Sequence, residues 1–299
     1  MRQSAFHLVV MISLLATRPL NGQDKLKIYI SVDIEGVVGV VSDQHMDPSG
    51  FEYAKAREWM TGEVNAAIDG VRAAGAAEIV VSDSHGNGQN LLVDRLPKDI
   101  TVVRSWPRPL MMMEGIDSTF DAAIFIGYHT STANPEGVRA HTFSSGRVAD
   151  FRLNGISMPE AGVNAAIAGH FGVPVILISG DAACVHEAQS LLGDIEGAVV
   201  KWPISYHSAR TLMPEVAYDL IREKAKRAVE RIADFEPYRL DTPITLDLRF
   251  KNYRPSQVLS LLPIVERTDS HSIRFVGKDV IEVSRFLEFI FSYDGSLAP

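Results

Sequence analysis

The sequence predicts an α/β protein, with a mostly parallel sheet flanked by helices and a smaller C-terminal α+β region. Short apolar runs alternate with longer helical patterns up to about residue 200, which is typical of βαβ units. After about residue 203 the alternation stops, and a charge-rich helical pattern at 213–234 precedes a strand pattern. We therefore divide the chain into a leader at 1–22, an α/β domain at 23–203 and a smaller α+β region at 204–299.

Apart from a hairpin at 149–157, the α/β domain is expected to contain five strands. The short apolar runs that predict them are 27–32, 78–82, 122–127, 175–179 and 198–201. A helical pattern over 51–74 separates the first two runs, and Gly75 ends it. A further helix is predicted over 181–192, between the last two strands.

Turn residues define the remaining elements. The dipeptide Asn154-Gly155 within 149–157 predicts a two-residue hairpin turn. Pro159 fits the first turn of a helix that runs to about His170. In the C-terminal region, 245–250 alternates apolar and polar residues as a half-exposed strand does. A final helix is predicted over 280–291, and the whole region would serve as a lid or an oligomer surface.

The composition excludes some classes of protein. The chain has 299 residues, of which 46% are hydrophobic and 22% charged, as in an ordinary globular protein. Its net charge of -8 is spread along the sequence and argues against a nucleic-acid partner. The single cysteine, Cys184, cannot form an internal disulfide. A small buried position on a helix explains it better than a nucleophilic role does.

The N-terminus resembles a secretory signal peptide. Arg2 precedes an apolar run at 5–16, and a polar stretch follows it. The run is too short for an ordinary membrane span, which needs about 20 apolar residues. Cleavage before Gln23 would remove 1–22, although Leu20 and Gly22 make a poor cleavage site. We expect an exported protein, periplasmic or extracellular, with no stable membrane insertion after signal removal; the alternatives are an uncleaved anchor and a mistaken start codon.

Asp33 and Glu35 are the most informative pair of residues. They follow the first predicted strand at positions i and i+2, so their side chains point the same way. Two carboxylates held this close repel each other, and a divalent cation compensates that repulsion best. The pair therefore predicts a metal site.

Further candidate ligands lie where other strands end or a helix begins. His85 and His129 follow the second and third predicted strands, and Glu160 opens the helix after Pro159. Carboxyl ends of parallel strands share one edge of a sheet, where ligands collect. The expected ligand set is Asp33, Glu35, His85, His129 and Glu160. Asp83 and Asp181 share the placement at strand ends.

These five residues suit two zinc ions better than one. Carboxylates and imidazoles bind borderline metals, of which zinc fits best. Five protein ligands are too many for one catalytic zinc with an open position, and are about right for two metals bridged by one carboxylate. Paired metals can bind a water, lower its pKa and polarise a carbonyl group.

Each residue also has an ordinary structural explanation. An aspartate after a strand is commonly a cap or turn residue. His129 could lie in a loop, and Glu160 could favour a helix N-terminus through the macrodipole. His141 follows the loop 130–138; it is either a general acid/base or oxyanion stabiliser, or a solvent-exposed loop residue.

The motifs in order resemble the DppA-type zinc D-aminopeptidases. The matching blocks are Ser31–Gly36, Ser82–His85, Glu114–Asp117, Gly127–His129, His141, Pro159–Asn164, Ser179–Asp181, Val200–Lys201 and Ile204–Ser205. Together they cover roughly residues 26 to 292. The resemblance implies a binuclear zinc peptidase that removes N-terminal D-amino acids from short peptides or amides.

The resemblance also implies roles for individual residues. Asp33 would bridge the metals, Glu35 and His85 would complete one site, and His129 and Glu160 the other. His141 would be the catalytic histidine near the substrate. The family forms ring-shaped decamers whose active sites face an internal channel, which implies a homo-oligomer that admits short peptides. An exported member would act on D-amino-acid peptides outside the cytoplasm, such as cell-wall fragments.

The expected reaction is metal-assisted hydrolysis by a metal-bound hydroxide. One alternative is a two-metal hydrolase of phosphoesters or L-peptides. Phosphate substrates usually require nearby cationic groups, and Arg139 and Arg152 are the obvious candidates. The other alternative is a non-catalytic exported protein that binds metal or peptide.

Overall fold

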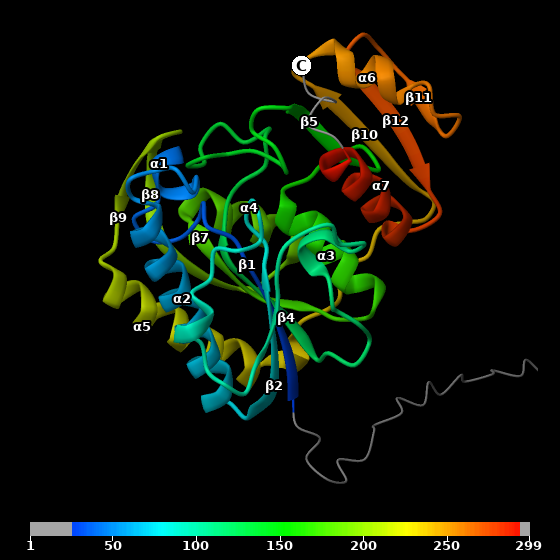
Figure 1. The fold of residues 1–299 in the computed structure, drawn as a ribbon. Coiled ribbons are helices and arrows are strands. Elements are labelled where there is room, and N and C mark those ends of the chain that lie inside the picture. The colour runs from blue at the N-terminus through cyan, green and yellow to red at the C-terminus, as the bar shows by residue number, and fades with distance from the viewer. Residues whose placement is uncertain (1–25, 294–299) are drawn as a thin grey trace, which may run out of the picture.

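The computed structural model describes residues 26–293 and contains two β-sheets (Figure 1). The order of the seven strands in the main sheet is β3 (Thr101–Val103), β2 (Ala76–Asp83), β1 (Leu26–Val32), β4 (Ala122–Tyr128), β7 (Val175–Asp181), β8 (Glu196–Ser205) and β9 (Ser208–Thr211). All neighbouring pairs are parallel except β8 and β9. The predicted α/β class with a mostly parallel sheet is confirmed.

Helices cover both faces of the main sheet. They are α2 (Tyr53–Ala73), α3 (Glu160–His170), α4 (Ala182–Leu192) and α5 (Pro214–Glu230). α2 packs against α5, and α3 packs against α4. The chain moves in opposite directions across the sheet through α2 and through α4, so right-handed crossovers place these two helices on opposite faces.

The second sheet is antiparallel. Its strand order is β11 (Val265–Arg267), β12 (Ser272–Gly277), β10 (Ile244–Phe250), β5 (Val148–Leu153) and β6 (Ile156–Ser157). Residues of β10 alternate between buried and more exposed positions, as the sequence predicts. The predicted hairpin joins β5 to β6, with positive φ angles of 50° at Asn154 and 80° at Gly155. α6 (Tyr253–Leu259) and α7 (Val280–Ser292) complete this part of the molecule.

Both sheets combine segments from the two sides of residue 203. The hairpin at 148–157 pairs with β10 in the second sheet, whereas β9 and α5 belong to the main sheet and its helical cover. The hairpin belongs to the second sheet, although it was predicted within the α/β domain, because β5 pairs antiparallel with β10. This pairing brings Phe151 opposite Leu248. A boundary at residue 203 therefore does not separate the sheets.

Several short elements were not predicted from the sequence. They are α1 (Asp43–Met46), α6, β3, β9, β11, β12 and the 3-10 turns Val93–Arg95, Met111–Met113 and Ile232–Asp234. Cys184 is buried on α4 as a free thiol, as expected. The predicted signal peptide lies outside the described residues. Within 26–293, the structure has no helix with the length and apolar character that a membrane crossing requires.

Strand order marks the position where a ligand site is expected. From β1 the chain winds outward through β2 to β3, then returns to the other side of β1 with β4 and continues through β7 and β8. In open α/β sheets, ligands bind at the carboxyl ends of the strands where the direction of winding reverses. Here that position lies between β1 and β4.

Candidate metal centre

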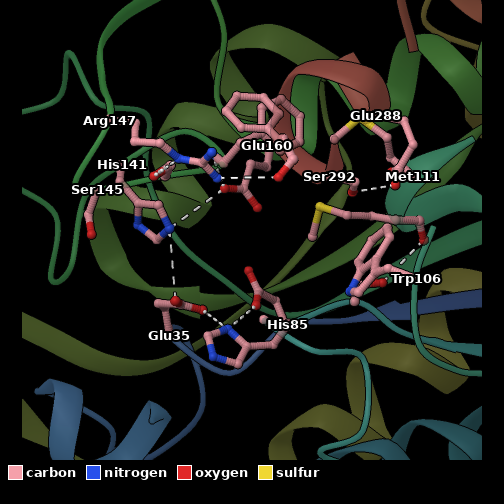
Figure 2. Close-up of a pocket in the computed structure, with 17 residues that line it drawn as sticks. Glu35, His85, Trp106, Met111, His141, Ser145, Arg147, Glu160, Glu288 and Ser292 are labelled. Atoms are coloured by element: carbon pink, nitrogen blue, oxygen red, sulfur yellow. Dashed lines mark hydrogen bonds and ion pairs between the residues drawn. The ribbon is translucent and has the colours of Figure 1, made fainter. Parts of the chain in front are cut away.

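All six candidate site residues meet at the reversal point of the main sheet. Asp33 and Glu35 follow β1, His85 lies two residues beyond β2, and His129 follows β4. Glu160 is the first residue of α3, and His141 lies in the long loop before β5. Figure 2 shows Glu35, His85, His141 and Glu160 pointing toward one cavity. The convergence predicted from the strand ends is therefore present in the structure.

Two glycines let the ends of β1 and β4 approach each other. The backbone N–H of Gly36 donates to the carbonyl oxygen of Gly127 at 2.7 Å. A Cβ on Gly36 would lie 1.9 Å from the carbonyl oxygen of Tyr128, and one on Gly127 would lie 2.3 Å from that of Asp33. Gly127 also has a φ of +70°, which side chains disfavour. This close approach holds the Asp33 carboxylate beside His129.

One half of the cluster is built around His85. Its Nδ1 lies 3.2 Å from Asp33 Oδ1 and 3.0 Å from Glu35 Oε2. Its Nε2 donates to the carbonyl oxygen of Met46 at 3.3 Å, since a carbonyl can only accept. A backbone partner on one ring nitrogen fixes the ring, so that the other nitrogen faces the two carboxylates.

The other half is built around His129. Its Nδ1 donates to the carbonyl oxygen of Thr130 at 2.9 Å. Its Nε2 lies 3.4 Å from both Asp33 Oδ2 and Glu160 Oε1, and is buried without a hydrogen-bond partner. The two oxygens of Asp33 therefore face two different histidines.

His141 completes the wall of the cavity. Its Nδ1 donates to the carbonyl oxygen of Arg139 at 2.7 Å, and its ring stacks on that of His129 with centroids 4.0 Å apart. Its Nε2 lies 3.9 Å from Glu35 Oε1 and 3.8 Å from Glu160 Oε1. Burial and the neighbouring His129 lower the pKa of His141. It is not a solvent-exposed loop residue, because its side chain is only 12% exposed.

The acidic and basic groups strongly perturb one another. Burial disfavours the charged imidazole of His85, but Glu35 and Asp33 outweigh it and raise its pKa well above the usual value. Glu160 and Asp33 likewise overcome burial and raise the pKa of His129 well above its usual value. Burial raises the pKa of Asp33, and the charge of Glu35 adds to that effect. The enclosed carboxylates thus favour positive charge at the position that these ring nitrogens face.

This donor set fits divalent metal ions. Ligand atoms about 2.0–2.2 Å from a tetrahedral zinc lie roughly 3.4 Å from one another, which matches the separations around His129 Nε2. Two groups of side chains offer ligand atoms within 4.8 Å of one another: Asp33, Glu35 and His129, and His129, His141 and Glu160. An unpartnered buried nitrogen between two carboxylates is the arrangement that a cation would satisfy.

Two buried charged residues, which the sequence did not single out as functional, hold the loop at 35–40. The ammonium group of Lys201 is enclosed and donates to three carbonyl oxygens of this loop. The acceptors belong to Glu35, Val37 and Val40. Glu63 accepts from the backbone N–H of Val38 at 2.8 Å. Burial lowers the pKa of Lys201 to about 8 and raises that of Glu63 to about 7. The sequence signal that could have revealed Lys201 is its position inside an apolar strand pattern.

The other two aspartates at strand ends stabilise backbone rather than join the cluster. Asp83 accepts from the backbone N–H groups of Asn90 and Leu91 at 2.6 and 2.7 Å. Asp181 caps α4 through the N–H of Cys184 and accepts from the N–H of Val138, both at 2.8 Å. They hold the loops that carry the histidines.

A cavity of about 490 Å³ opens beside the cluster. This volume is typical of sites for small molecules. Beyond the candidate ligands and His141, its wall contains apolar and polar side chains that sequence reasoning did not identify. Among them are Trp106, Met111, Phe143, Arg147, Glu288 and Phe291. Several of these are labelled in Figure 2.

Comparisons with known proteins agree with this geometry. Residues 26–289 match the family Peptidase_M55, described as D-aminopeptidase. A D-aminopeptidase of Bacillus subtilis (strain 168) is 33% identical over 258 residues, which cover 86% of this chain and 93% of that protein. The solved structure of the Zn-dependent D-aminopeptidase DppA from Bacillus subtilis, a self-compartmentalizing protease, superposes with a TM-score of 0.85. The two sequences are 32% identical, and the superposition covers 89% of this chain and 96% of the DppA chain. This chain therefore belongs to the D-aminopeptidase family and is a hydrolase of the metallopeptidase class.

Proposed function

We propose that this protein is a binuclear zinc aminopeptidase that removes N-terminal D-amino acids from short peptides or amides. The observation that carries the proposal is the position of Asp33, whose two oxygens face His85 and His129 separately. A carboxylate in that position suits a bridge between two cations. The D-preference rests on the relatives named above.

The cluster divides into two groups around Asp33. Glu35 and His85 would hold one zinc ion, and His129 and Glu160 the other, with Asp33 shared. When bound, a pair of such ions supplies an activated water and polarises the scissile carbonyl group.

The chain's own residues contribute orientation and proton handling. The carbonyl of Arg139 fixes the proton on His141 Nδ1, so His141 Nε2 faces the cavity and can exchange a proton with substrate. The N–H of Phe143 donates to Glu160 Oε1 at 2.6 Å, which orients this carboxylate. Trp106, Phe143 and Phe291 give part of the cavity wall an apolar character.

Phosphoester hydrolysis receives no support from the two arginines that favoured it. Arg139 pairs with Asp43 and contacts His207 Nδ1 at 3.3 Å. Arg152 pairs with Asp150 at 2.7 Å. Neither arginine is among the residues that line the cavity.

A panel of substrates tests the proposal. Purified protein is assayed with D- and L-alanyl amides, a D-alanyl dipeptide and a phosphodiester, and its metal content is measured by elemental analysis. We expect two zinc ions per chain and hydrolysis of the D-substrates, abolished by thorough chelation. Faster hydrolysis of the L-amide or the phosphodiester would contradict the substrate assignment, and undiminished hydrolysis after chelation would contradict the metal assignment.

We also propose an exported homo-oligomer. The similar Bacillus subtilis enzyme is described as self-compartmentalizing, and the family resemblance implies a decamer. Four exposed apolar side chains on α6 and in the segment between α6 and β11 offer a surface for a second copy of the chain. These four are Tyr253, Val258, Leu261 and Ile264. Export rests on the apolar N-terminal segment, and N-terminal sequencing of secreted or periplasmic protein would test it.

A further inference from the structure

Arg147 is a cation in a cavity whose lining also contains four carboxylates. It is the only lysine or arginine among the residues that line the cavity in the described part of the chain. The same cavity presents the carboxylates of the metal cluster and Glu288, which is 8% exposed. In Figure 2, Arg147 lies on the side of His141, whereas Glu288 lies across the cavity near Met111.

The guanidinium of Arg147 has few partners of its own. Its Nε donates to Ser144 Oγ at 3.3 Å and its Nη2 to the carbonyl oxygen of Phe291 at 3.5 Å. It also lies 5.3 Å from the centre of the Phe291 ring. Among residues 26–293, no carboxylate forms an ion pair with it, whereas Arg152, five residues on, pairs with Asp150. Most of the five N–H donors of Arg147 thus remain available.

A half-buried arginine without an ion-pair partner has N–H groups that a bound ligand can use. Burial lowers the pKa of Arg147, the expected effect on a cation whose solvation is reduced without compensation. Guanidinium groups bind carboxylates through two parallel N–H···O bonds. The chemistry of this position therefore matches a carboxylate supplied by a ligand in the cavity.

The proposed reaction supplies such a group. A short peptide placed with its scissile bond at the metal cluster carries a free carboxylate at its C-terminus, about 3.5 Å further away per extended residue. Resting on the proposed aminopeptidase function, we infer that Arg147 binds the C-terminal carboxylate of the peptide. The enzyme then prefers di- and tripeptides with a free C-terminus over amidated peptides.

A purely structural role is the competing explanation. Arg147 also connects the turn at 144–147 to α7 through Ser144 and Phe291. If Arg147 only holds the structure together, its replacement should lower kcat/KM equally for all substrates. If Arg147 binds the carboxylate, its replacement should lower kcat/KM only for substrates that carry a free C-terminal carboxylate.

The first experiment uses the wild-type holoenzyme. Its kcat/KM is compared for a D-alanyl dipeptide and for the same dipeptide with an amidated C-terminus. We expect the free acid to be preferred by about 10–100-fold, the value of a charge-assisted hydrogen-bonded pair. Equal values for the two substrates would overturn the inference without any variant.

The second experiment uses Arg147→Met, Arg147→Lys and the control Arg152→Met. In Arg147→Met we expect KM for the free acid to rise about 10–100-fold while values for the amide stay near wild type, so that the preference disappears. Arg147→Lys keeps the charge without the planar fork and should give an intermediate preference. Arg152→Met should retain the full preference. Equal losses for both substrates, or no loss in Arg147→Met, would overturn the inference.

Binding separates this inference from the proposed function. Isothermal titration calorimetry measures the Kd of a dipeptide analogue whose amide is replaced by a CH2–NH group, in free-acid and amidated forms. We expect only the free acid to lose about 10–100-fold in affinity in Arg147→Met. If the wild type hydrolyses no D-peptide, the proposed function fails, yet this binding difference still decides the role of Arg147.

Discussion

Asp33 is the residue on which the cluster depends, since each of its carboxylate oxygens faces a different histidine. In Asp33→Asn the volume is kept but one negative charge and one strong ligand oxygen are lost. We expect both metal affinities to fall more than about 100-fold, because even residues that only support a ligand contribute 10–100-fold. Glu35→Gln removes a ligand from only one half of the cluster, so this variant should retain up to one metal ion per chain.

Elemental analysis of dialysed protein measures this difference, with wild type as the reference. Activity should disappear in both variants. Two metal ions retained per chain in Asp33→Asn would contradict a bridging role for this carboxylate.

His141 lies close enough to the cluster to act as a ligand or as a proton carrier. In His141→Ala we expect the metal content to remain at the wild-type value while kcat falls roughly 10²–10⁴-fold, as on loss of a general acid or base. Metal content measured on the same sample distinguishes the two roles. Loss of one metal ion would make His141 a ligand, together with His129 and Glu160.

Glu63 makes stability depend on pH. Burial raises its pKa from 4.5 to about 7, so between these values the folded state keeps a proton that the unfolded state has released. The free energy of unfolding contributed by this group therefore falls as pH rises from about 4.5 to about 7, and stays constant above. Between about pH 5 and about pH 8, we expect the decrease to be smaller in Glu63→Gln than in wild type by roughly 2–3 kcal/mol.

Urea denaturation followed by circular dichroism at the two pH values measures this effect. Glu58→Gln, nearer the surface of the same helix, is the matched control and should behave like wild type. Parallel pH dependence in wild type and Glu63→Gln would show that Glu63 titrates normally in the folded protein.

At the scale of elements, long periodic segments were predictable and short ones were not. The pattern at 51–74 predicts α2, observed at Tyr53–Ala73, and the run at 122–127 predicts β4, observed at Ala122–Tyr128. The strand β3 is only Thr101–Val103 and is exposed or half-buried, and the β-branched run at 100–103 is too short to predict a strand by itself. It becomes a strand because it pairs with β2 at the sheet edge, which is information that only the tertiary structure holds.

The contact between α2 and α5 requires a glycine. A Cβ on Gly70 would lie 2.3 Å from the carbonyl oxygen of Arg222 and 2.8 Å from Cβ of Ala225. Gly70→Val must push the helices apart, and we expect it to lower the free energy of unfolding by about 1–3 kcal/mol or more. Ala54→Val, at an exposed position of the same helix, should cost only a few tenths of a kcal/mol from helix propensity.

Thermal or urea unfolding of both variants measures this cost. A Gly70→Val protein as stable as Ala54→Val would mean that α5 does not rest on α2 at this distance.

At the scale of the whole molecule, the sequence could predict where the metal ligands meet but not what surrounds them. Four of the five predicted ligands, Asp33, Glu35, His85 and His129, follow strand ends. Parallel strands bring their carboxyl ends to one edge of the sheet, so local patterns are enough to predict where these ligands meet. Phe291 and Glu288 reach the same cavity from α7, which packs on the second sheet and against α3. No local pattern indicates that packing, so Arg147 and its neighbours could be recognised only in the folded chain.

The proposed homo-oligomer makes a prediction about the exposed apolar segment on α6 and beyond it. Leu261 is 81% and Ile264 63% exposed, and burying such side chains against a second copy is favourable by about 25 cal/mol per Å². In the double variant Leu261→Asp with Ile264→Asp, each buried carboxylate would cost several kcal/mol, so we expect the assembly to dissociate to smaller species. Phe51→Asp, at a side chain that is 79% exposed on another part of the surface, is the matched control and should keep the wild-type mass. Analytical ultracentrifugation measures both, and hydrolysis of longer peptides should increase only in the double variant, because an opened compartment no longer restricts access. A double variant of wild-type mass, or a wild type that is already monomeric, would show that this surface does not hold the protein together.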